Sequence, residues 1–81
     1  MSDRPIYVIA GEIRDNWSII GKGVSPYAEP YLAAMETIVS IDEMYYYDDA
    51  DSVVRYFLTN ANSWRGETAR RVKAELKGML T

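Results

Sequence analysis

The chain has 81 residues and a net charge of −3, and 48% of its residues are hydrophobic while 26% are charged. A chain of this length builds one hydrophobic core, so we expect a single globular domain over residues 1–81. It contains no cysteine and no histidine, which excludes disulfides, thiolate nucleophiles and histidine-based acid–base or metal chemistry.

Targeting and catalytic signals are missing as well. No apolar run approaches the roughly 20 residues of a membrane-spanning helix, and MSDRPIYVIAGEI at the N-terminus lacks the cationic start and cleavage site of a secretory signal. We therefore expect a cytoplasmic protein with no membrane partner. Paired carboxylates could do acid–base work, but they need a cleft that so short a chain has little room to form. We expect no enzymatic activity, no cofactor and no catalytic or metal-binding residues.

The N-terminal segment has a β-like composition. Residues 6–13, IYVIAGEI, are rich in Ile, Val and Tyr, and RDN at 14–16 reads as a turn. The β-like composition resumes in WSII at 17–20. This pattern predicts an N-terminal β-hairpin. Because a two-stranded ribbon is marginal alone, its apolar face must pack on helices.

Two helical segments are expected in the middle of the chain. Pro30 suits the first turn of a helix over about residues 30–39, because a missing N–H costs nothing there. SIDE at 40–43 has the Ser-x-x-Glu form of a capping box, which indicates a further short helical turn.

The C-terminal half predicts a pair of helices. The first, over about residues 52–61, has Asp49 or Asp51 as its N-cap. Its apolar residues recur with helical period: Val53, Val54, Phe57, Leu58 and Ala61. Asn62 or Ser63 caps the last helix, which turns these residues inward: Ala69, Val72, Leu76, Met79 and Leu80. The fold class is therefore α+β, an N-terminal β-hairpin packed on three to four short helices, with the C-terminal helix pair forming much of the core.

Charge is distributed unevenly along the chain. Residues 1–51 carry three basic and ten acidic side chains, a net charge of −7, whereas residues 52–81 carry six basic and two acidic ones, a net charge of +4. Such asymmetry indicates either a basic binding face or two poles that attract between copies.

The last helix is the candidate for nucleic-acid contact. Residues 52–80 have the outline of a helix-turn-helix unit, and five basic residues would contact DNA: Arg65, Arg70, Arg71, Lys73 and Lys77. The alternative is a solvated helix end, because the helix dipole favours basic residues there. Overall acidity also opposes nonspecific phosphate binding. We therefore rank DNA contact by this helix below the solvated helix end.

Trp64 and Gly66 have a functional and a structural interpretation. Trp64 could stack on a nucleotide base, but a tryptophan at a helix start more often packs between elements, with its N–H bonded to backbone. Gly66 would then allow another segment to approach closely. Packing is the preferred interpretation. Within the same helix, Glu67 stands four residues before Arg71, so we also expect an ion pair between them.

The segment MYYYDDADS, residues 44–52, is the preferred interaction surface. Its acidic residues invite comparison with a Ca²⁺ site, but the EF-hand spacing fails, because a glycine is absent at the sixth position. Tyrosines among carboxylates suit contact with a basic partner surface. We expect the interface to comprise Tyr45, Tyr46, Tyr47, Asp48 and Asp49.

The string VVRYFLTNANSWRGETARRVKAEL, residues 53–76, resembles a segment of small uncharacterised accessory proteins encoded by tailed phages that infect actinobacteria. The resemblance implies a phage accessory protein, made in the host cytoplasm, that binds a host or phage component. It implies no catalytic or binding residue. The function we expect is a non-enzymatic protein–protein interaction module, able to self-associate through its two poles. The alternative is a helix-turn-helix DNA-binding regulator.

Overall fold

A computed structural model describes residues 4–45 and 48–80. These residues form four helices, α1 (Ile6–Trp17), α2 (Glu29–Met35), α3 (Ala50–Thr59) and α4 (Glu67–Met79). A short antiparallel strand pair, β1 (Met44–Tyr45) and β2 (Asp48–Asp49), precedes α3. None of the helices in these described ranges is long and apolar enough to cross a bilayer.

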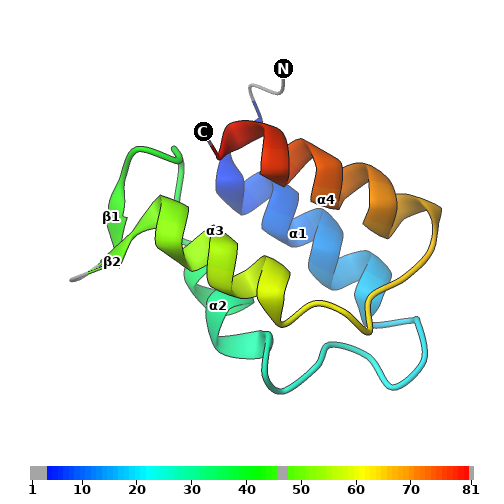
Figure 1. The fold of residues 1–81 in the computed structure, drawn as a ribbon. Helices are drawn as coiled ribbons and strands as arrows, with labels where there is room; N and C mark the ends of the chain where they lie inside the picture. The colour runs from blue at the N-terminus through cyan, green and yellow to red at the C-terminus, as the bar shows by residue number, and fades with distance from the viewer. Residues whose placement is uncertain (1–3, 46–47, 81) are drawn as a thin grey trace.

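The helices pack pairwise around one cluster of buried side chains. α1 lies against both α2 and α4, and α2 lies against α3. Figure 1 shows α1 and α4 side by side and running in opposite directions, with the strand pair projecting at one end of the molecule. The start of α1 and the end of α4 therefore lie at the same end.

The predicted N-terminal β-hairpin is wrong, because residues 6–17 form the single helix α1. Its buried residues are spaced three and four apart, which is the helical period: Ile6, Ile9, Ala10, Ile13 and Trp17. Pro5 precedes the helix with φ −58° and ψ 146° and occupies its N-cap position. The β-propensity of Ile and Val is a weak preference, and burying this stripe in the core outweighs it. The fold is mostly helical rather than α+β.

The prediction for the middle of the chain is confirmed in part. α2 begins one residue earlier than predicted and ends at Met35, with Pro30 in its first turn. The capping-box contact at 40–43 forms, since the Glu43 carboxylate accepts the Ser40 amide at 2.8 Å. Residues 41 and 42 form only a turn, and no helix follows it, because strand β1 begins at Met44.

The two C-terminal helices are present with the predicted inward faces. Val53, Val54 and Phe57 are buried on α3, and Asp49 is its N-cap. α4 buries Ala69, Val72 and Leu76. The core is nevertheless not built from this pair alone, because α3 packs mainly on α2 and α4 packs on α1.

The start of α4 differs from the prediction. Gly66, not Asn62 or Ser63, is the N-cap, with φ +114°. A Cβ at Gly66 would meet no atom within 4 Å, so close approach of another segment does not explain the glycine. The left-handed backbone conformation explains it, because residues with a side chain rarely adopt that φ.

Trp64 belongs to the core. It is fully buried and stacks on Trp17, with ring centroids 5.8 Å apart, while Trp17 meets Phe57 edge-on at 6.1 Å. The Trp64 Nε1–H donates to the Asn16 side-chain oxygen at 3.0 Å. The packing interpretation of Trp64 is thus confirmed, but the partner of its N–H is a side chain of α1 rather than backbone.

We predict that Asn16→Ala destabilises the protein by about 1–2 kcal/mol, because a buried indole N–H loses its acceptor. In a Trp64→Phe background, which has no N–H, the same change costs much less. Urea unfolding of the four proteins in this double-mutant cycle measures the coupling. Equal costs of Asn16→Ala in both backgrounds would contradict the proposed role of the hydrogen bond.

Candidate functional site

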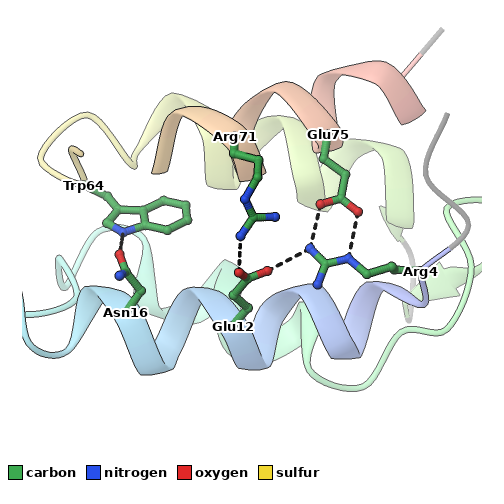
Figure 2. A network of polar contacts seen from close by, with 6 residues as sticks. All are labelled: Arg4, Glu12, Asn16, Trp64, Arg71 and Glu75. Carbon is green, nitrogen blue, oxygen red and sulfur yellow. Dashed lines mark hydrogen bonds and ion pairs between the residues drawn. The ribbon is translucent and has the colours of Figure 1, made fainter. Parts of the chain in front are cut away.

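A network of four charged side chains joins the N-terminal segment, α1 and α4. The Arg4 guanidinium donates to Glu75 at 2.6 and 2.9 Å and to Glu12 at 2.8 Å. Arg71 donates to the other Glu12 oxygen. Figure 2 shows how Glu12 on α1 bridges the two arginines, beside the Asn16–Trp64 bond. The predicted ion pair between Glu67 and Arg71 is wrong, because Arg71 pairs with Glu12 on α1 instead.

Glu12 is held in its charged form by this network. Partial burial alone would raise the pKa of Glu12, but the hydrogen bonds from Arg4 and Arg71 outweigh burial and leave that pKa below its ordinary value of 4.5. The pKa of Arg4 is raised by its bonds to Glu75 and Glu12. These charges neutralise one another inside the molecule, so they serve folding rather than an outside partner.

Two further basic residues are neutralised in the same way. Arg14 on α1 donates to Glu29 and Glu36, the residues that begin and follow α2, with its shortest contacts at 2.8 Å. Arg55 pairs with Asp51 one turn earlier on α3. The pKa of Arg14 is raised by its bonds to Glu36 and Glu29.

Four of the five remaining basic residues belong to α4 and the loop before it: Arg65, Arg70, Lys73 and Lys77. Arg65, Arg70 and Lys77, which we name the basic flank, are exposed and make no ion pair with the residues that the structure describes. Arg65 and Arg70 line an open pocket of about 360 Å³ at the start of α4. The only other lysine or arginine in residues 4–45 and 48–80 with neither an ion pair nor a hydrogen bond through its side chain is Lys22, in the loop before α2.

Lys73 lies beneath the basic flank and has a structural role. Its ammonium donates to the carbonyls of Ala61 and Trp64 at 2.8 and 2.7 Å, and lies 5.8 Å from the centre of the Trp64 ring. Burial lowers the pKa of Lys73, and the nearby charges of Lys77 and Arg65 lower it further. Three positive charges therefore lie close together at this place, and none of them makes an ion pair with the described residues.

The structure separates the five residues predicted to contact DNA. Arg71 is paired with Glu12 and Lys73 is bonded to backbone, which leaves Arg65, Arg70 and Lys77 as the three whose charge has no partner among the described residues. The connection between α3 and α4 spans residues 60–66, longer than the three or four residues of a helix-turn-helix. DNA binding stays a prediction, supported by fewer residues than the sequence indicated.

The predicted tyrosine–aspartate surface is described only in part. Tyr46 and Tyr47 lie outside the described residues, and of Tyr45 the structure describes the backbone, which pairs with Asp48. Asp48 is exposed. The Asp49 carboxylate accepts the Ser52 amide at 2.7 Å as the cap of α3, and this bond lowers the pKa of Asp49. Helix capping accounts for Asp49, and the interface stays a prediction.

Sequence reasoning missed one aromatic pair, in which Tyr56 is exposed and Tyr31 is partly buried. Tyr56 on α3 and Tyr31 on α2 pack with ring centroids 5.6 Å apart, and Tyr56 is 51% exposed. The signal was available, because Tyr56 lies off the apolar stripe of residues 53–61. A tyrosine at such a position is turned toward the surface.

The acidic residues do not assemble a metal site within the described part of the chain, where no group of three His, Cys, Asp or Glu side chains could hold an ion. Comparison with protein-family models, curated proteins and solved structures gives no match. The resemblance of residues 53–76 to phage proteins therefore stays a prediction.

We predict that Glu12→Gln destabilises the protein by about 1 kcal/mol at neutral pH, a modest value because the pairs are partly exposed. The folded-state pKa of Glu12 lies below its unfolded value, so its contribution is present above pH 4.5 and is lost as the pH falls through the lowered pKa. Urea unfolding at neutral and acidic pH should show the two proteins converging at low pH. A constant difference would contradict this account.

Proposed function

We propose that the protein is a non-enzymatic protein–protein interaction module that binds an acidic partner surface through the basic flank. One observation carries the proposal. Arg4, Arg14, Arg55 and Arg71 are neutralised by carboxylates of the same chain, whereas the basic flank is exposed and uncompensated. Keeping such charges together costs repulsion, which an acidic partner would relieve.

An acidic protein is a better partner than DNA on the evidence of charge. The whole chain has a net charge of −3, so its long-range field repels any anionic partner in proportion to that partner's charge, and duplex DNA carries one negative charge per about 1.7 Å of its axis. Three accessible basic residues form a small contact, whereas DNA binding usually uses many phosphate contacts. The resemblance of residues 53–76 to phage accessory proteins adds a context in which the partner is a host or phage component.

A fluorescein-labelled poly-glutamate peptide is a suitable probe, because it presents carboxylates without a particular fold. We predict that the protein raises its fluorescence anisotropy at low ionic strength. The triple variant Arg65→Gln/Arg70→Gln/Lys77→Gln should bind about tenfold more weakly, because three exposed ion pairs are lost. Binding should also decline as salt is added.

Lys22→Gln is the control for Arg70→Gln, since both remove one unpaired surface charge. Lys22→Gln should leave the affinity unchanged while Arg70→Gln lowers it. Equal binding by the triple variant and the parent protein would overturn the proposal, as would absence of binding at low ionic strength. Tighter binding to a mixed-sequence DNA duplex than to poly-glutamate would overturn it in favour of the DNA-binding alternative.

A further inference from the structure

An acidic end lies at the start of α3, whereas Arg65 and Arg70 of the basic flank line a pocket beside the loop that follows α3. We define the acidic end as Asp42 and Asp48, which make no ion pair with the described residues. Both lie beside the start of α3, where the Ala50 amide donates to the Glu43 carbonyl at 2.7 Å. Each is therefore free to meet a cation from outside.

The two charged places lie at opposite ends of the same helix. α3 has ten residues, which corresponds to a length of about 15 Å. Figure 1 shows the strand pair at the start of α3, and the loop to α4 at its other end. Arg65 and Arg70 lie beyond that second end, beside the pocket at the start of α4. The surface of α3 thus runs from an acidic end to a basic one.

The surface between these ends offers contact area. Tyr56, near the middle of α3, is half exposed and rests on Tyr31. Tyrosine supplies a large, rigid contact at low entropic cost, which is why it is enriched in interfaces. Its position between two opposite charges suits a partner with the same features in reverse order.

We infer that this partner is a second copy of the chain, packed antiparallel across α3 so that each acidic end faces Arg65 and Arg70 of the other copy. The inference rests on the proposed function and names the acidic partner of the same basic flank. In an antiparallel pair with two-fold symmetry both sets of opposite charges meet in one interface. A parallel pair would place like charges together, and a head-to-tail chain of copies would leave a charged end unsatisfied.

Charge reversal tests the arrangement. The variant Arg65→Glu/Arg70→Glu and the variant Asp42→Lys/Asp48→Lys should each be monomeric in sedimentation velocity at low ionic strength, at concentrations where the parent dimerises. In an equal mixture, every contact of the antiparallel pair is again between opposite charges. The mixture should form a dimer of about twice the 9.2 kDa chain mass, with a dissociation constant at least about tenfold lower than either variant alone.

Recovery in the mixture also shows that both variants are folded, since unfolded chains would not associate through these surfaces. A parent protein that stays monomeric at high concentration would overturn the inference, and so would variants that dimerise like the parent or a mixture that does not associate. Mass that keeps rising beyond a dimer would overturn the two-fold arrangement. Poly-glutamate binding by a strictly monomeric protein would overturn this inference while leaving the proposed function standing.

Discussion

The antiparallel packing of α4 on α1 is the constraint on which the rest of the structure depends. Trp64 is fully buried against Trp17, and its indole N–H is satisfied only because Asn16 reaches it from α1. A tryptophan contributes more apolar contact than any other side chain, so its location fixes where α4 begins. The register of the pair follows, with Glu12 opposite Arg71.

This packing gives the two sides of α4 different surroundings. The side that carries Arg71 and Glu75 faces α1 and the N-terminal segment, where carboxylates and guanidiniums pair within the molecule. The other side carries Arg70 and Lys77, which are exposed and make no ion pair with the described residues. Lys73 on this helix stabilises the α3–α4 loop, because its ammonium donates to the carbonyls of Ala61 and Trp64. The account of function depends on this division.

The features of the fold that could be predicted from the sequence are those set by residues close together in the chain. The apolar stripe of α3 and its cap are local patterns, and the sequence predicted the stripe and limited the cap to Asp49 or Asp51, of which the structure has Asp49. α1 was mistaken for a hairpin because Ile6, Ile9 and Ile13 favour strands by composition, while their spacing, which is helical, decides what they bury. Here the error lay in ranking composition above period.

The ion-pair network was beyond the reach of sequence reasoning for a different reason. Glu67 is the expected neighbour of Arg71 within one helix, but the actual partner, Glu12, is 59 residues away. Only the docking of α4 on α1 brings these side chains together. The sequence therefore shows which residues are basic, but it does not separate those that stabilise the fold from those whose charge remains unpaired.

Adjacent arginines provide the most direct test of that sorting. Arg70→Gln and Arg71→Gln change the same charge at neighbouring positions of α4, and each protein can be measured by urea unfolding and by poly-glutamate binding. The account predicts that Arg71→Gln lowers the free energy of unfolding with little change in binding. Arg70→Gln should instead weaken binding with little change in the free energy of unfolding. If both variants lose stability and binding to the same extent, the division of α4 into a folding side and a binding side is wrong.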